Sequence, residues 1–226
     1  MGALIDLATR SPLLQVALDL TNLGRAIAIA REVARAGAQV IEVGTPLIKV
    51  WGRIAVSGVA EVSGGSLVLA DTKTADAARV ELEPIASAGA KAVTVLGVSS
   101  DEVVEEALAL CLEKGIDLVV DMIHVPNPVD RALRLADLGA RVFELHVGVD
   151  VQKRRGLDAR ALMKEVEELA RSGLLVAVAG GIKPESAGEF VSHGARIVVI
   201  GGAIYRSENP FEEARKALSS ISAAIR

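Results

Sequence analysis

Short apolar runs rich in Val, Ile, Leu and Ala recur along the whole chain, separated by longer amphipathic stretches. Such runs flanked by turn residues predict buried strands, and apolar positions spaced by three or four residues predict helices. We expect strands at residues 13–19, 39–43, 67–71, 92–96, 118–121, 141–146, 175–179 and 196–200. A last helix is expected after Phe211. The pattern therefore predicts eight strand–helix units.

A glycine precedes most of the expected strands, at the point where a helix must end. These glycines are Gly37, Gly89, Gly115, Gly139, Gly173 and Gly194. Glycine adopts the left-handed conformation that closes a helix, so the boundaries are well marked. Alternating strands and helices predict parallel pairing with right-handed crossovers. Eight units in 226 residues predict an α/β fold with one domain over residues 1–226, a (β/α)8 TIM barrel.

An open doubly wound sheet is the alternative architecture. Such sheets usually have fewer strands and a glycine-rich first turn. The first expected turn here reads Asp19-Leu20-Thr21-Asn22 and contains no glycine. The barrel is therefore the better prediction.

Composition narrows the class of protein. Hydrophobic residues make up 51% of the chain and aromatic residues only 2%, as suits a parallel sheet covered on both sides. A net charge of −4 without a basic cluster argues against nucleic acid as a partner. Apolar runs are only strand-length and no signal-peptide pattern opens the chain, so we expect a cytoplasmic protein with no membrane partner. The lone Cys111 is expected to be a core residue.

Polar residues gather at the carboxyl ends of the expected strands, where barrels of this kind carry their chemistry. In chain order these ends carry Asp19, Glu42, Asp71 with Lys73, Thr94, Asp121, His146, and the pairs Gly180-Gly181 and Gly201-Gly202. A barrel kept only for stability has no need of this arrangement. The sequence therefore predicts an active site at this end.

The most informative segment has the pattern Asp-x-Lys-x-x-Asp and contains Asp71, Lys73 and Asp76. Side chains alternate along a strand, so Asp71 and Lys73 are expected on one face and Asp76 at the start of the following helix. An isolated match of this kind is more often a salt-bridged strand end. Glu42 should neighbour Asp71, and two carboxylates there favour Mg²⁺. Without a cation, one of them should have a raised pKa.

The glycine pairs after the last two strands indicate an anion site. Gly180, Gly181, Gly201 and Gly202 would let backbone N–H groups approach a phosphate, and a short helix is expected from Ala203. The alternative is that these glycines only make tight turns. Paired loops at these positions are the usual phosphate site of such barrels, so a phosphorylated substrate is expected.

Two further residues complete the candidate site. His146 has an ordinary pKa that suits proton transfer, although a lone His beside an apolar strand is more often structural. Asp19 could hold a substrate hydroxyl. His124, after the fifth strand, is a weaker candidate, and His193 is expected to cap a helix.

These residues resemble the orotidine-monophosphate-decarboxylase-like group of barrels, a ribulose-phosphate-binding type, and within it the 3-hexulose-6-phosphate synthases. The resemblance is carried by LQVALDL (14–20), IEVGTPLIK (41–49), ADTKTADA (70–77), VTVLG (93–97), VAGGI (178–182) and IGGAIY (200–205). The relatives differ in informative ways. Orotidine-monophosphate decarboxylases carry a lysine near the end of strand two and an arginine after strand eight, where this chain has Glu42 and Gly202.

The resemblance implies a Mg²⁺-dependent aldol reaction of D-ribulose 5-phosphate with formaldehyde, giving D-arabino-3-hexulose 6-phosphate. In that reaction Glu42 and Asp71 would hold the metal and His146 would transfer a proton. Lys73 would stabilise an enediolate and Asp19 would orient the sugar. The family also implies a homodimer in which Asp76 reaches the site of the neighbouring subunit.

Two alternatives remain open at this point. A 3-keto-L-gulonate-6-phosphate decarboxylase would place Glu at the end of strand five and Arg shortly after the strand-six His, where this chain has Asp121 and Val147-Gly148. A non-catalytic sugar-phosphate-binding barrel would not need the full set of polar residues. Lys153 and Arg154, which follow His146 in a segment unlike that of the synthases, are expected in a solvated loop.

Overall fold

The computed structural model describes residues 2–225 and contains eight parallel strands closed into a barrel in chain order, β1 to β8. The strands are β1 (Leu13–Leu18), β2 (Val40–Val43), β3 (Leu67–Thr74), β4 (Ala92–Leu96), β5 (Asp117–Asp121), β6 (Val142–His146), β7 (Leu175–Ala179) and β8 (Ile197–Ile200). The pairing of β1 with β8 closes the sheet. The predicted (β/α)8 TIM barrel is confirmed.

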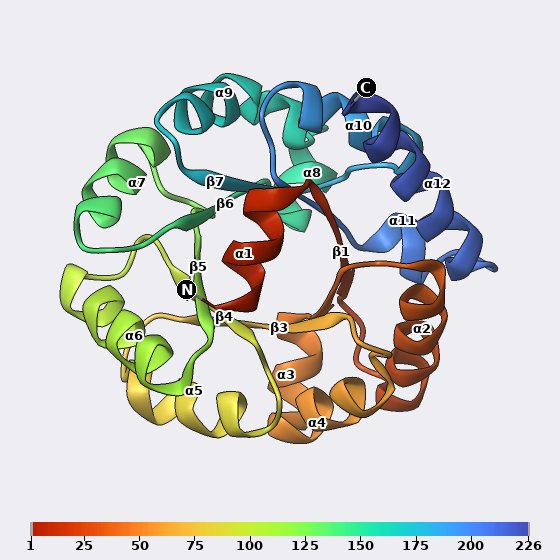
Figure 1. The fold of residues 1–226 in the computed structure, drawn as a ribbon, viewed down its shortest axis with the longest axis horizontal. Helices are drawn as coiled ribbons and strands as arrows, with labels where there is room; N and C mark the ends of the chain where they lie inside the picture. Colours follow the sequence, from red (N-terminus) through yellow and green to blue (C-terminus); the bar gives the residue numbers. More distant parts are fainter. Residues whose placement is uncertain (1, 226) are drawn as a thin grey trace.

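Helices cover the outside of the barrel, as Figure 1 shows. They are α2 (Leu23–Ala36), α3 (Thr45–Trp51), α4 (Arg53–Val62), α5 (Ala78–Ser87), α6 (Asp101–Lys114), α7 (Pro128–Asp137), α9 (Met163–Arg171), α10 (Ala187–Ser192), α11 (Gly202–Tyr205) and α12 (Pro210–Ala224), with short 3-10 turns at Ala159–Leu162 and Pro184–Ser186. The short helix α8 (Val149–Arg155) lies within this ring in the view of Figure 1. The six glycines predicted to end helices all have positive φ. Helix α12 begins one residue before Phe211, in agreement with the expected last helix.

Apolar side chains form two layers, one on each face of the sheet. The outer face of the strands packs against the helices in a large cluster that includes the buried Cys111, and burial raises the pKa of this thiol to about 12. A second cluster fills the inside of the barrel and includes Leu4 and Ala8. Apolar side chains therefore fill the inside of the barrel near α1, and polar side chains can enter the interior only toward the carboxyl ends of the strands.

Helix α1 (Ala3–Arg10) lies across one end of the barrel in Figure 1. The buried carboxylate of Asp117, at the start of β5, accepts hydrogen bonds from the backbone N–H groups of Gly2 (2.9 Å), Leu4 (2.7 Å) and Ile5 (3.2 Å). These bonds satisfy N–H groups that the first turn of a helix cannot satisfy itself. The helix closes the amino-terminal end of the barrel, and the carboxyl ends of the strands carry the site.

The third strand departs from the prediction. It was expected to end at residue 71, but β3 continues to Thr74, with an irregular register against β4 between Ala70 and Thr74. Helix α5 begins only at Ala78, so Asp76 lies in the connection and not at the helix start. The Asp-x-Lys-x-x-Asp pattern therefore begins in the irregular end of β3 and finishes in the connection to α5.

Among residues 2–225 no helix is long and apolar enough to cross a bilayer.

Candidate active site

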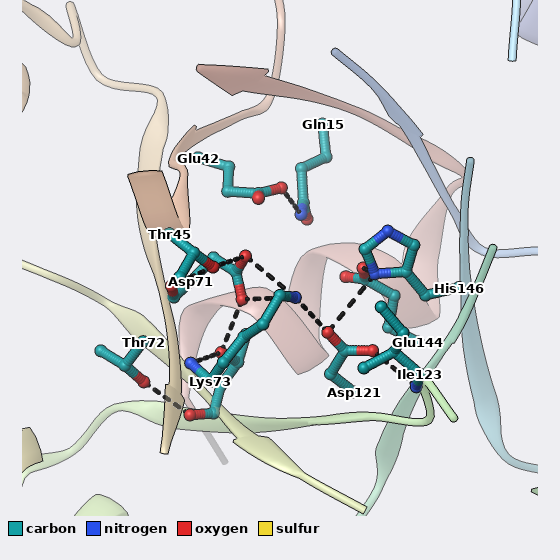
Figure 2. A network of polar contacts seen from close by, with 11 residues as sticks. Gln15, Glu42, Thr45, Asp71, Thr72, Lys73, Asp121, Ile123, Glu144 and His146 are labelled. Atoms are coloured by element: carbon teal, nitrogen blue, oxygen red, sulfur yellow. Dashed lines mark hydrogen bonds and ion pairs between the residues drawn. The ribbon is translucent and has the colours of Figure 1, made fainter. Parts of the chain in front are cut away.

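Lys73 stands at the centre of the polar cluster, between carboxylates from two strands (Figure 2). Its Nζ lies 3.2 Å from Asp71 Oδ1 and 3.1 Å from Oδ2 on β3, and it forms an ion pair with Asp121 Oδ2 on β5. The side chain of Lys73 is 22% exposed and that of Asp121 is fully buried. Strand β4 separates the two carboxylates along the sheet, so the lysine bridges them inside the barrel.

The backbone of Lys73 explains how its side chain reaches this position. Its φ is +47°, which is uncommon for a residue other than glycine, and its N–H donates to Thr94 Oγ1 (2.9 Å). Bulges at the ends of strands redirect side chains in this way. Alternation along β3 correctly predicted that Asp71 and Lys73 approach each other, but the bulge turns the lysine toward β5.

Asp71 is held by hydroxyl groups from both neighbouring elements. Thr45 Oγ1 donates to its Oδ2 (2.5 Å), and Thr94 Oγ1 donates to its Oδ1 (2.8 Å). Thr94 lies inside β4 and not at its end, so it serves Asp71 as a fixed donor. Bonds of this kind fix the rotamer of a buried carboxylate, which makes Asp71 a rigid part of the site.

Asp121, Glu144 and His146 form the opposite wall. Asp121 pairs with Glu144 in the register of β5 and β6, and its Oδ1 accepts the N–H of Ile123 (2.9 Å). Nδ1 of His146 lies 3.4 Å from Asp121 Oδ2 and 3.4 Å from Glu144 Oε1. Figure 2 shows the imidazole above both carboxyl groups, with its second nitrogen directed away from them.

The charges of these groups are strongly interdependent. Burial alone raises the pKa of Asp121, but the hydrogen bond and charge of His146 and the charge of Lys73 lower it to about 2. Burial and the charge of Asp121 raise the pKa of Glu144 to about 8. Burial lowers the pKa of His146, but the hydrogen bond and charges of Asp121 and Glu144 outweigh it and raise the value. At neutral pH Asp121 is ionised, whereas Glu144 holds its proton more tightly than an ordinary carboxyl group.

Glu42 lies on β2 near Asp71, and among residues 2–225 it forms no ion pair with a cationic side chain. Its Oε2 accepts a hydrogen bond from Gln15 Nε2 (2.6 Å), and burial together with the charges of Asp71 and Glu144 raises its pKa well above the usual range. This agrees with the expectation that one carboxyl of the pair titrates high. The buried Oε1 of Gln15 has no hydrogen-bond partner in the part of the chain that the structure describes, residues 2–225.

The donor set beside Glu42 fits a hard divalent cation. Carboxylate oxygens from Glu42 and Asp71 and an orphaned amide oxygen from Gln15 are the donors that Mg²⁺ prefers. One ligand atom from each of Asp121, Glu144 and His146 also lies within 4.8 Å of the other two. Asp121 of that trio forms an ion pair with Lys73, and Asp71 also lies 3.1 Å from the ammonium group, whereas Glu42 forms no ion pair among residues 2–225. The carboxyl group of Glu42, without a counter-charge beside Asp71, therefore favours a cation at Glu42 and Asp71.

The predicted glycine pairs follow β7 and β8. Gly180 and Gly181 have φ of +120° and +71°, and Gly201 precedes the short helix α11, which begins at Gly202. A Cβ on Gly180 would lie 2.6 Å from the carbonyl oxygen of Val147, the residue after His146. The loop after β7 is thus pressed against the end of β6.

Asp19 links the glycines to the carboxylate cluster. Asp19 lies directly after β1 and not within it, because the strand ends at Leu18. Its Oδ2 lies 3.4 Å from where a Cβ on Gly201 would stand. Reduced hydration at the barrel mouth and the charge of Asp71 raise the pKa of Asp19. The structure thus places Asp19 between the last glycine loop and Asp71, although much of the residue is exposed.

Replacing Gly180 with alanine should destabilise the protein by about 3 kcal/mol, because the new Cβ meets backbone atoms of Val147 at a strained φ. Gly181→Ala is the matched control. Its φ of +71° is less strained, and the nearest atom, at 3.1 Å, belongs to the flexible side chain of Gln152, so we expect a loss of about 1 kcal/mol. Urea denaturation of both variants measures the difference. Equal losses would show that Val147 does not constrain the loop.

Other predicted residues lie outside the cluster. Asp76 and His124 are exposed, and His124 has a positive φ of 62° in the turn after β5. His193 caps α10 as expected, and its Nδ1 lies 2.6 Å from Glu167 Oε1 on α9. The segment with Lys153 and Arg154 was wrongly expected to be a loop. It forms the exposed helix α8, ended by Gly156 in the left-handed conformation.

Glu144 and Gln15 are the site residues that the sequence did not single out. Each is a buried polar residue inside an apolar strand, where burying the polar group is costly unless it has a partner or a function. The alternation of β6 places Glu144 on the face of His146, and this signal was available in the sequence. Asp121 had been noted as a strand end, but its contact with Lys73 could not be predicted.

Comparison with known proteins identifies the family. The profile of the orotidine 5'-phosphate decarboxylase / HUMPS family matches residues 12–217. This chain belongs to that family. The members are enzymes, and the polar cluster described above lies at the end of the barrel where enzymes of this fold carry their chemistry.

One sequence relative and two solved structures are similar to this chain over nearly its whole length. A 3-hexulose-6-phosphate synthase of Staphylococcus epidermidis is 35% identical over 210 residues, covering 92% of this chain and 98% of the relative. The crystal structure of a 3-hexulose-6-phosphate synthase from Salmonella typhimurium has a TM-score of 0.88 at 32% identity and covers 94% and 99% of the two chains. A 3-keto-L-gulonate-6-phosphate decarboxylase from Vibrio cholerae has a TM-score of 0.83 at 25% identity, with coverage of 94% and 98%.

Proposed function

We propose that this enzyme catalyses the aldol condensation of D-ribulose 5-phosphate with formaldehyde to D-arabino-3-hexulose 6-phosphate, or the reverse reaction. The observation that carries the proposal is the placement of Lys73 between Asp71 and Asp121 with His146 on the opposite wall. This arrangement offers a proton-transfer group and a fixed positive charge around one space. Relatives named 3-hexulose-6-phosphate synthase over nearly the full chain support it.

The chain's own residues divide the work as follows. His146 takes the proton from C1 of the sugar through the nitrogen that faces away from Asp121, and Asp121 stabilises the resulting imidazolium. The ammonium group of Lys73 stabilises the negative charge that develops on the neighbouring oxygens. Asp19 orients a sugar hydroxyl, and the loops at Gly180-Gly181 and Gly201-Gly202 receive the phosphate.

Mg²⁺ is part of the proposal because the oxygen donors beside Glu42 fit it. Glu42 and Asp71 would hold the ion, and Gln15 would orient Glu42 through its amide. When bound, such an ion acts as a Lewis acid toward substrate oxygens. We also propose a homodimer, to which the exposed Asp76 would contribute across the interface. The proposed reaction would join formaldehyde to a sugar phosphate, or release it from one, and so belongs to carbohydrate metabolism.

Formaldehyde loss in the presence of ribulose 5-phosphate tests the reaction and the metal together. We expect consumption with Mg²⁺, none with EDTA, and a loss of at least about 100-fold in Asp71→Asn, because the amide cannot supply the charge. Asp6→Asn, at an exposed ion pair on α1, is the matched control and should remain fully active. Full activity and unchanged metal dependence in Asp71→Asn would refute the metal assignment.

The alternative is decarboxylation of 3-keto-L-gulonate 6-phosphate. A solved decarboxylase of that substrate shares the fold at 25% identity. Against it stands Val147, which follows His146 and offers no cation. If formaldehyde is not consumed under any condition, CO₂ release from that substrate is the next measurement.

A further inference from the structure

Glu144 is a buried carboxyl group for which the proposed reaction has no step. It lies on β6 two residues before His146, so both side chains face the inside of the barrel. Only 6% of Glu144 is exposed. Within residues 2–225 its carboxyl group has one side-chain partner, Nδ1 of His146 at 3.4 Å. Burying a carboxyl group with so few partners costs free energy of folding. An apolar side chain at this position would stabilise the barrel better, so stability alone does not explain Glu144.

The same nitrogen lies equally far from the hydrogen-bond acceptor Asp121 and from the carboxyl oxygen of Glu144. Nδ1 of His146 is 3.4 Å from Asp121 Oδ2, and Asp121 and Glu144 are register partners on adjacent strands. Carboxyl groups from two adjacent strands therefore lie on the Nδ1 side of the ring, as Figure 2 shows. A single acceptor at this distance is a weak restraint, because hydrogen bonds to imidazole nitrogen are usually shorter.

We propose that Glu144 is a positioning residue for His146. Together with Asp121 it holds the proton on Nδ1 and fixes the plane of the ring, so that Nε2 stays directed away from both carboxyl groups. A second acceptor that orients an imidazole and selects its tautomer is a recurrent device around functional histidines. The kinetic consequence rests on the proposed function, but the positioning does not.

The state of Glu144 is compatible with this role. Burial and the charge of Asp121 raise its pKa, which favours the protonated form, and a protonated carboxyl group still has a carbonyl oxygen that can accept from Nδ1–H. A second negative charge beside Asp121 is thereby avoided. The role needs an acceptor and not a charge, and this distinction makes it testable.

Two substitutions separate an acceptor from a filler. Glu144→Met keeps the length of the side chain without the acceptor, and the apolar group should be tolerated in the barrel. We expect kcat to fall about tenfold while the KM for ribulose 5-phosphate stays within threefold. Glu144→Gln restores an acceptor of the same shape and should return kcat to within threefold of the original. Thermal melting of both variants verifies folding.

Side-chain ¹⁵N spectra give a readout independent of turnover, and the chain has only three histidines to assign. In the original protein the neutral His146 should carry its proton on Nδ1, and in Glu144→Met its signals should move toward a mixture of tautomers. Glu167→Met is the matched control, because Glu167 accepts from Nδ1 of the surface residue His193. It should move only the His193 signals and leave kcat unchanged.

Each outcome decides the inference. If Glu144→Met leaves both kcat and the His146 signals unchanged, Glu144 is only a barrel filler and the inference is wrong. Loss of kcat without a change in these signals, or a failure of Glu144→Gln to restore them, also overturns it. If the original protein consumes no formaldehyde but the His146 signals respond as expected, the proposed function fails and the positioning role stands.

Discussion

Lys73→Met will lower kcat/KM by about 10²- to 10³-fold and destabilise the protein at pH 7 by about 2–4 kcal/mol. The loss of turnover follows because the only cation that contacts both Asp71 and Asp121 within residues 2–225 is removed. The loss of stability follows because two buried carboxylates lose their counter-charge. The expected loss of stability is smaller than for a fully buried ion pair, because 22% of the lysine side chain is exposed to solvent. Formaldehyde consumption and urea denaturation measure the two effects.

The stability difference should also depend on pH. The folded-state pKa of Asp121 lies near 2, below its ordinary value of 3.8, so its ionisation stabilises the fold above pH 4 and this contribution is lost as the pH falls toward 2. Removing Lys73 removes part of that stabilisation. The difference between the two proteins should therefore be full at pH 6 and shrink between about pH 4 and pH 2.

Lys114→Met is the matched control for this substitution. Lys114 also contacts two carboxylates, those of Glu83 and Glu113, but at the surface. Because exposed ion pairs contribute little to stability, we expect Lys114→Met to leave both the free energy of unfolding and turnover nearly unchanged. If Lys73→Met were as mild as Lys114→Met, the central role of Lys73 would have to be abandoned.

His146→Gln will lower kcat by about 10²- to 10⁴-fold, the usual contribution of a general acid–base group. The amide has a similar shape and can still donate to Asp121, so the fold should be retained. What it lacks is a nitrogen that can take and return a proton. Steady-state kinetics with ribulose 5-phosphate and formaldehyde give the loss, which should fall on kcat rather than on KM.

The pH profile identifies the group responsible. The neutral imidazole is the base. The hydrogen bond and charge of Asp121 outweigh the effect of burial and raise its pKa, so kcat/KM should fall as the pH drops through a value above 6.5. This acidic limb should vanish in His146→Gln. His193→Gln, at the surface pair with Glu167, should keep both the rate and the limb. An unchanged limb in His146→Gln would mean that another group titrates there.

Much of the active site was visible in the sequence because parallel strands end at the same face of a barrel. Glu42, Asp71 and His146 could be placed at one end from the positions of their strands alone. Asp71 and Lys73 could be paired because neighbours two apart share a face. The segment after His146 was misjudged because a short helix such as α8, with no buried residue, has little apolar periodicity.

The sequence by itself determined the eight strand–helix units, their boundaries at glycines and the end of the barrel that carries polar residues. These features depend on local backbone preference and on apolar periodicity, which each segment contains within itself. Only the tertiary structure decided that Lys73 reaches Asp121, that Asp121 reaches His146 and that α1 closes the opposite end. These contacts join residues 48, 25 and more than 110 positions apart. They depend on the bulge in β3, on strand register and on closure of the sheet, and no single segment specifies any of the three.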